Sequence, residues 1–218
     1  RRANARPECG VLGAEGQRRH LVGLVHDDVP GSLVPKVFAD TGQGGRTAAE
    51  QLIAAGQTRI AFIGGPEQLM SVRERWLGFC TAMQQAGLAV PPEWVMYGNY
   101  TREFGQQALN HLFSCHQRPT AVFAASDYLV LGLLDGLRAN GLQAPAALSL
   151  VGFDDANYTD LTQPRISTIR QPARELGHTA VNIMLRLLNN ESDIPMETRL
   201  PVEWIGRDSI GFVNSVPK

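Results

Sequence analysis

The chain has 218 residues, of which 44% are hydrophobic and 19% are charged, so it has enough apolar material for one large domain or two lobes. Its formal net charge of -1 excludes an overall field that would attract nucleic acid or an anionic membrane, and no apolar run approaches the roughly 20 residues needed to span a bilayer. The three cysteines and five histidines lack the spacing of a zinc site, which predicts no metal, no cofactor and a reduced, cytoplasmic setting.

Residues 1–33 differ in composition from the rest of the chain. They are rich in arginine and glycine and contain one short apolar patch, HLVGLV, so we expect an irregular basic arm with at most one strand. The basic start, RRANARPECG, lacks the apolar core that follows in a secretory signal. Arginines in such a tail can contact phosphate, although they are more often solvated.

From residue 34 onward the sequence alternates between short apolar runs and longer segments of helical periodicity. The predicted strands cover residues 34–40, 59–65, 94–100, 120–126, 148–155, 165–171 and 197–209, and the predicted helices cover residues 44–56, 71–88, 102–114, 127–141 and 173–190. This alternation predicts an α/β fold with a doubly wound parallel sheet and helices on both faces. In such sheets, ligands bind beyond the carboxyl ends of the strands.

Polar side chains stand at or shortly after the ends of these strands. Singly, they have structural explanations: Asp127 can cap a helix, Ser71 can form a capping box with Glu74, and Asp155 can hold a turn. Together they suit a polyhydroxylated ligand, because charged groups bind paired hydroxyls and an aromatic ring covers the apolar face of a sugar-like ring. The set comprises Asp40, Ser71, Arg75, Tyr100, Ser126, Asp127, Asp154 and Asp155.

Catalysis has little support in the sequence. There is no G-x-S-x-G nucleophile elbow, no phosphate-binding P-loop and no G-x-G-x-x-G after a strand, and no histidine follows a strand to act as a base. Asp154 and Asp155 are neighbours, so their side chains should point to opposite faces of the strand. We therefore expect one carboxylate to face a ligand and the other to serve the structure, and we predict a binding protein, not an enzyme.

Several segments, in order along the chain, resemble the effector-binding domain of LacI-type bacterial transcription regulators. They are S-x-x-x-R-x-x-G-F at 71–79, VGFDD at 151–155, P-x-[IL]-[ST]-T-[IV]-x-Q at 164–171 and R-x-S at 207–209. The likeness runs from about Val34 to Ser209 and implies a periplasmic-binding-protein-like fold of type I, with the effector held between two lobes.

The resemblance also implies how the chain is divided. No family match is visible in residues 1–33, where neither the family's DNA-binding headpiece nor most of its N-terminal lobe is found. Residues 34–163 would form the C-terminal lobe, 164–192 the crossover strand and helix of the N-terminal lobe, and 193–218 the final strand of the C-terminal lobe and a tail. The expectation is one complete lobe plus a fragment of the other.

Individual positions take roles from the same resemblance. Arg75 looks like the arginine that grips effector hydroxyls, Asp154 like the ligand-facing carboxylate, and Tyr100 like an aromatic ring against the ligand. Ser126 stands where the family has an asparagine. The implied ligand set is Phe38, Ser71, Arg75, Tyr100, Ser126, Asp127, Asp154 and Gln171.

The leading hypothesis is the sensing domain of a sugar-responsive transcription regulator. It would bind a sugar-like effector, pair as a homodimer in the cytoplasm, and reach DNA only through a headpiece absent from this chain. Effector binding would close the cleft and shift a two-state arrangement of the lobes. The alternative is a solute-binding protein of a sugar ABC transporter, and an enzyme of doubly wound fold or an inert remnant are further possibilities.

Overall fold

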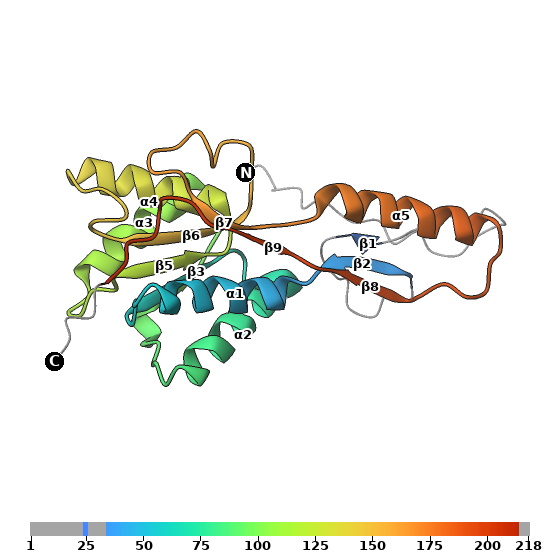
Figure 1. Cartoon of the computed structure of the whole chain (residues 1–218), viewed down its shortest axis with the longest axis horizontal. Coiled ribbons are helices and arrows are strands. Elements are labelled where there is room, and N and C mark those ends of the chain that lie inside the picture. The colour runs from blue at the N-terminus through green and yellow to red at the C-terminus, as the bar shows by residue number, and fades with distance from the viewer. Residues whose placement is uncertain (1–23, 26–33, 214–218) are drawn as a thin grey trace, which may run out of the picture.

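The computed structural model describes residues 24–25 and 34–213, which form two lobes of unequal size separated along the long axis of the molecule (Figure 1). The larger lobe contains a six-stranded sheet and the smaller one a three-stranded sheet. Of the predicted basic arm, residues 1–23 and 26–33 lie outside the described residues. The expected α/β class, with a mainly parallel sheet covered by helices, is confirmed.

The large sheet has the strand order β4-β3-β5-β6-β7-β9. Neighbouring strands run parallel, except that β7 and β9 pair antiparallel. Every residue of β3 and β5 is buried, as expected for strands covered on both faces. The strands are β3 Ile60–Gly64, β4 Val95–Tyr97, β5 Ala121–Ala124, β6 Ser149–Asp154, β7 Ser167–Arg170 and β9 Glu203–Ile205.

Two pairs of helices cover the opposite faces of the large sheet (Figure 1). Alternate residues of the strands point to opposite faces of the sheet and belong to two hydrophobic clusters. Phe62 and Phe123 pack with α1 and α2, whereas Ala61 and Val122 pack with α3 and α4. The core therefore lies in two layers, one on each side of the sheet. The helices are α1 Thr41–Ala54, α2 Met70–Gln85, α3 Arg102–Ser114 and α4 Asp127–Ala139, with the short 3-10 helix η1 Pro92–Trp94 before β4.

The small lobe consists of a three-stranded parallel sheet with one helix packed against it. This helix, α5, buries Leu176 and Ile183 toward the sheet and exposes Val181, Leu185 and Leu188. Among the described residues, no helix of either lobe is long and apolar enough to cross a membrane. The elements are β1 Leu24–Val25, β2 Lys36–Ala39, α5 Ala173–Leu188 and β8 Glu197–Leu200.

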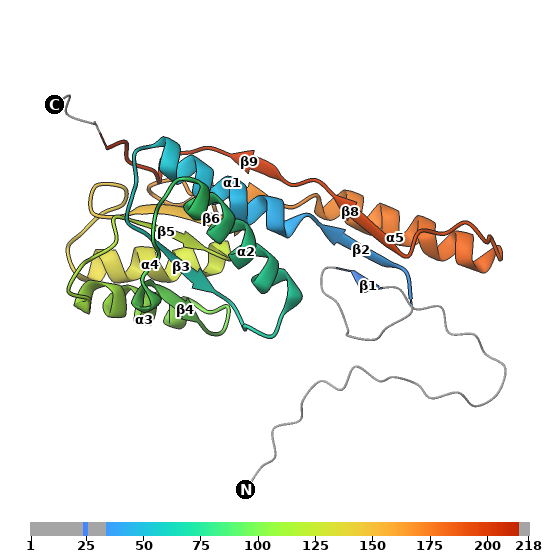
Figure 2. The same ribbon diagram turned by 90° about the horizontal axis from the view of Figure 1, so that it is seen from below.

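The chain passes between the two lobes three times within residues 34–213: after β2, after β7 and after β8 (Figures 1 and 2). The crossing segments are tied to one another. The Asp40 N–H donates to the Leu200 carbonyl at 2.8 Å, and Arg170 pairs in register with Glu203. A bundle of short crossing segments is the kind of hinge about which two packed bodies can rotate.

The lobe membership of three strands differs from the boundaries that the sequence predicts. The sequence places β2 in the large lobe and β7 in the small one, whereas β2 pairs with β8 in the small sheet and β7 pairs with β6 in the large sheet. The strand predicted over residues 197–209 is two strands in different sheets. The break falls at Pro201, which has no N–H to continue a ladder, and the chain leaves the small sheet there.

Candidate functional site

The carboxyl ends of the parallel strands in the large sheet face the small lobe, because β7 leads directly into a crossing segment at that end (Figure 1). A chain of contacts joins four predicted site residues along this edge. Arg75 of α2 donates to the carbonyl oxygen of Ala125 at 2.5 Å. The next residue, Ser126, donates to Asp154 at 3.2 Å, and Asp154 accepts from Gln171 at 2.6 Å. The structure therefore brings these four residues into one site beside the hinge.

Arg75 is the most unusual member of this site. Its side chain is only 2% exposed, and its guanidinium carbon lies 3.7 Å from the centre of the Phe153 ring, in a cation–π contact. One terminal nitrogen is used by Ala125, but Nε and Nη2 are buried without a hydrogen-bond partner. Buried donors of a charged group are costly when left unsatisfied, so this side chain is suited to an acceptor that arrives from outside the chain.

Asp154 and Gln171 provide the complementary acceptors. Asp154 ends β6 with a positive φ of 113°, and its two carboxylate oxygens accept from Ser126 and Gln171. Each carboxylate oxygen has more than one lone pair, so further donors can be accepted. The side-chain oxygen of Gln171 is buried without a partner. Unsatisfied donors on Arg75 and an unsatisfied acceptor on Gln171 together match a ligand whose groups both donate and accept, as hydroxyls do.

Asp127 is directed inward, away from this edge. It is fully buried, and its two oxygens accept from the Thr168 hydroxyl at 2.7 Å and from the Ala156 N–H at 2.9 Å. Burial raises the pKa of Asp127 to about 7, and the charges of the nearby Asp154 and Asp155 add to the rise. The two hydrogen bonds lower this pKa but do not offset the effect of burial. The structure thus ties α4 to β7 and to the loop after β6 through Asp127. The helix cap itself is Ser126, which accepts from the Tyr128 N–H.

The remaining predicted residues lie in α2, in the loop after β4 and in β2. Ser71 is buried in the first turn of α2. Tyr100, partly buried, packs so closely on Gly65 that a side chain there would overlap its ring. Phe38 is buried in β2 of the small lobe, with the Arg199 guanidinium 5.6 Å from its ring centre.

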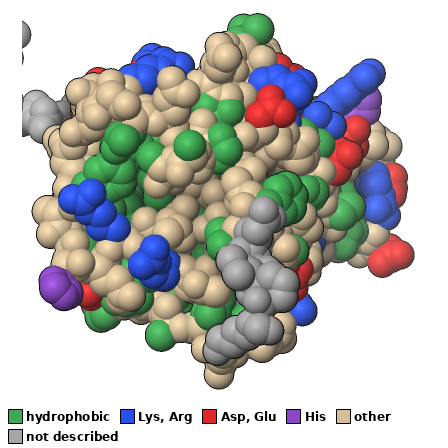
Figure 3. Space-filling view, turned by 60° about the vertical axis from the view of Figure 1, so that its left-hand side comes forward, with side chains coloured by type: hydrophobic (Ala, Val, Ile, Leu, Met, Phe, Trp, Pro, Cys, Tyr) green, Lys and Arg blue, Asp and Glu red, His purple; other side chains and the backbone are tan. Residues whose placement is uncertain are grey.

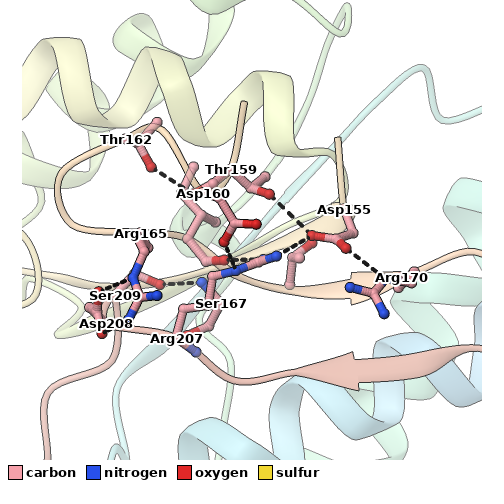
Figure 4. A network of polar contacts seen from close by, with 12 residues as sticks. Asp155, Thr159, Asp160, Thr162, Arg165, Ser167, Arg170, Arg207, Asp208 and Ser209 are labelled. Atoms are coloured by element: carbon pink, nitrogen blue, oxygen red, sulfur yellow. Dashed lines mark hydrogen bonds and ion pairs between the residues drawn. The ribbon is translucent and has the colours of Figure 1, made fainter. Parts of the chain in front are cut away.

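Asp155 serves the structure, as the sequence predicts for one of the two acids (Figure 4). Its carboxylate contacts Arg207 at 2.8 Å and Arg170 at 2.7 Å, and it accepts from the Thr159 hydroxyl at 3.1 Å. Burial alone would raise the pKa of Asp155, but hydrogen bonds from Arg170 and Arg207 outweigh it and hold that pKa below its usual range. The carboxylate is thereby fixed against the ends of β7 and β9.

Sequence reasoning did not find the contact between the lobes made by Glu74. Its carboxylate accepts from both terminal nitrogens of Arg199 on β8 and from the Thr41 hydroxyl. The predicted capping box of Ser71 and Glu74 is wrong, because α2 has Leu69 at its N-cap and no side-chain cap. No local pattern marks this pair, since Glu74 and Arg199 lie 125 positions apart.

A hollow of about 530 Å³ lies on the opposite side of the large lobe, where β6 and β7 begin. It contains several apolar side chains, among them Leu134, Leu137 and Leu142, with Arg138 and Asp208 at its margin. Lys and Arg side chains stand apart among neutral and hydrophobic ones on this end of the lobe (Figure 3). Within the described part of the chain, no group of three or more His, Cys, Asp or Glu could hold a metal ion.

Comparison with known proteins gives the following similarities. Residues 49–210 match the model of the family described as periplasmic binding protein-like domain. The HTH-type transcriptional repressor PurR of Vibrio campbellii is 30% identical over 198 residues, which cover 87% of this chain and 59% of the repressor. PurR of Shigella sonnei is 31% identical over 194 residues, 88% of this chain and 57% of the repressor. The chain thus spans less than two thirds of the length of these relatives.

Among solved structures, the transcriptional regulator CelR in complex with cellobiose is similar with a TM-score of 0.79 and 32% identity, over 86% of this chain and 57% of that one. A LacI family transcriptional regulator from Enterococcus faecium with bound ribose has a TM-score of 0.79 and 28% identity, over 88% of this chain and 71% of that one.

Proposed function

This chain belongs to the periplasmic binding protein-like domain family, and we propose that it is the effector-binding domain of a LacI-type transcription regulator that senses a polyhydroxylated small molecule. The observation that carries the proposal is the buried Arg75, whose Nε and Nη2 have no partner beside the Asp154 carboxylate at the hinge between the lobes. The similar proteins are named as repressors and regulators, and two of the solved structures have a sugar bound. These names support a sensing role over transport or catalysis.

In this proposal the site residues have different roles in ligand binding. The free nitrogens of Arg75 donate to ligand oxygens, while Asp154 and the Gln171 side-chain oxygen accept from ligand hydroxyls. Ser71 and Ser126 add hydroxyls at the same edge. Two aromatic side chains, Tyr100 and Phe38, provide apolar surface from either lobe. Asp127 holds this edge in place from the interior and does not bind the ligand itself, because both of its carboxylate oxygens already accept hydrogen bonds within the protein.

The ligand would act on gene expression by changing the angle between the lobes. An effector that binds one arrangement better shifts the population toward it, and pairing with a second copy would carry that change to a DNA-binding segment. The side chain of Leu161, which is 85% exposed, offers apolar surface that such pairing would cover. Isolated basic side chains on the end of the large lobe where β6 and β7 begin (Figure 3) give little electrostatic attraction for DNA. We therefore expect operator binding only through another segment. We expect the regulator to act in the cytoplasm.

Calorimetric titration of the protein with ribose, cellobiose, gluconate and a purine base tests the proposal. We expect ribose, cellobiose or gluconate to bind without being consumed, and we expect no sequence-specific DNA shift by the described lobes at physiological salt. Ligand turnover that is lost in Asp154→Asn would indicate an enzyme instead. Recovery of the native protein from periplasmic rather than cytoplasmic extract would favour the transporter alternative.

A further inference from the structure

Arg207 lies in the segment after β9 and connects three parts of the chain (Figure 4). Its side chain is only 7% exposed. Nη2 contacts Asp155 at 2.8 Å, Nε contacts Asp160 at 2.6 Å, and Nη1 donates to the Ile166 carbonyl at 2.8 Å. All three nitrogens of the guanidinium are used at once. A planar fork bound in this way fixes its partners in direction as well as in distance.

The backbone next to these contacts has an unusual conformation. Asp154 has a φ of 113° and Asp155 a φ of 59°. Residues other than glycine rarely adopt positive φ, and such residues persist when the surrounding contacts over-determine them. The contacts of the Asp155 side chain with Arg170, Arg207 and Thr159 supply that constraint. Asp154, whose carboxylate stands at the candidate ligand site, is thus held by contacts made by its neighbour.

We propose that Arg207 is a positioning residue for the effector site: by gripping Asp155, it maintains the turn that presents the Asp154 carboxylate to the ligand. The inference rests on the proposed function, because it concerns how that same site is held. Arg207 makes its contacts to Asp155, Asp160 and Ile166, and it acts on the ligand only through the turn. Its loss is expected to loosen residues 154–159 and to weaken effector binding together.

Arg165 provides a matched control within the same region (Figure 4). It also forms an ion pair with an aspartate, since its Nε and Nη2 bind Asp208 at 2.7 and 3.2 Å. The two side chains of that pair are 55% and 52% exposed, and the contacts do not include Asp155. Arg165→Gln therefore removes an arginine and an ion pair close by without touching the proposed positioning contact.

Hydrogen–deuterium exchange measured by mass spectrometry tests the turn without any ligand. In Arg207→Gln, exchange of the amides in residues 154–159 is expected to rise by about tenfold or more, while residues 121–125 in the centre of the sheet stay protected. Arg165→Gln should match the wild type. Arg207→Lys should fall between, because lysine keeps the charge near Asp155 but loses the fork. Wild-type exchange at residues 154–159 in Arg207→Gln would overturn the proposal.

Ligand affinity tests the link to the site. Ribose, cellobiose, gluconate and a purine base are titrated into the wild type, and the tightest binder becomes the probe. Arg207→Gln should lower its affinity by about tenfold, and Arg165→Gln should leave it unchanged. Leu109→Ala, in the buried α3 core, measures what lost stability alone does to affinity. A loss in Arg207→Gln no larger than in Leu109→Ala would refute a positioning role.

The two measurements separate the possible failures. If none of the four probes binds the wild type, the proposed function fails for these ligands, while amide exchange still decides whether Arg207 holds the turn. If Arg207→Gln does not fold, Arg207→Lys carries both measurements, and unchanged exchange together with unchanged affinity in that variant counts against the proposal.

Discussion

The carboxylate of Glu74 and the guanidinium of Arg199 form an ion pair with two hydrogen bonds that joins the two lobes. Nη1 and Nη2 of Arg199 on β8 donate to the two oxygens of Glu74 on α2 at 3.1 and 2.8 Å. Thr41, just after the first crossing, donates to the same carboxylate at 2.7 Å. Glu74 directly precedes Arg75, so the contact between the lobes and the proposed ligand contact come from adjacent residues of one helix.

A double-mutant cycle of Glu74→Gln and Arg199→Gln should show coupling in the free energy of unfolding. The two side chains are 22% and 35% exposed, so solvent screening limits the coupling to about 1 kcal/mol. The control pair Arg46–Glu50 lies on one turn of α1 and is 41% and 43% exposed, for which about 0.3–0.5 kcal/mol is expected. Urea denaturation measures both cycles, and equal coupling in the two pairs would argue against a special role for Glu74 and Arg199.

Arg75→Met should separate ligand binding from stability. Methionine retains the apolar contact with the Phe153 ring but removes every donor, so the affinity for the effector should fall about a hundredfold, or ~3 kcal/mol. The matched control is Arg73→Ala, in the same helix but exposed to solvent, which should bind as the wild type does. Calorimetry and urea denaturation measure the two effects, and unchanged affinity in Arg75→Met would remove Arg75 from the site.

Asp127→Asn should change how stability depends on pH. The pKa of Asp127 is raised to about 7 in the folded protein from an ordinary value of 3.8, so between these values the folded state holds a proton that the unfolded state has released. The contribution of Asp127 is therefore complete below about pH 4 and is lost as the pH rises through about 7, with a slope approaching ~1.4 kcal/mol per pH unit. The contribution of Asp155, whose pKa is lowered, changes with pH in the opposite direction. It cancels in the comparison because both proteins contain Asp155.

The measurement is the difference in free energy of unfolding between wild type and Asp127→Asn, taken by urea denaturation at several pH values from about 4.5 to 7.5. The wild type should lose stability relative to the variant as the pH rises. Asparagine can still accept from the Ala156 N–H and donate to the Thr168 hydroxyl, so the variant should fold. A difference that does not vary with pH would contradict the assignment of a protonated Asp127.

Two glycines should respond oppositely to alanine. A Cβ at Gly152 in β6 would lie 2.1 Å from Oδ1 of Asp127 and 3.3 Å from Cγ2 of Val130, so Gly152→Ala should destabilise the fold by about 3 kcal/mol. At Gly177 in α5, nothing lies within 4 Å of such an atom, and alanine should stabilise the helix by about 0.5–1 kcal/mol. Urea midpoints check both, and a tolerated Gly152→Ala would show that Asp127 can move.

The order of helices and strands was predictable because the spacing of apolar residues along the sequence reflects which side of each element is buried. The continuous apolar run of β3 and the one-sided pattern of α5 identify these elements directly. Lobe membership was not predictable in this way, since β2 and β7 are both short extended segments followed by a helix. Their different sheets depend on partners far away in sequence, β8 for the first and β6 for the second.

The site shows the same division between local and distant information. Arg75 and Asp154 were predicted as ligand contacts because the resemblance and the end of a strand mark them. Whether Asp127 faces a ligand or the interior depends on the space left at Gly152 and on the Thr168 hydroxyl in the neighbouring strand, which no sequence spacing encodes. The roles of Arg207 and Glu74 likewise follow from contacts between distant segments.

The parallel pairing of β2 with β8 imposes an order of assembly on the molecule. Many residues lie between these two strands, so during synthesis β2 emerges well before β8 and waits for it while the intervening residues are made. Contacts between such distant segments form slowly, because the entropy of closing the intervening loop is lost first. Once the large lobe has folded, its crossing segments hold β2 and β8 side by side and remove most of that cost. The small lobe is therefore expected to become native last.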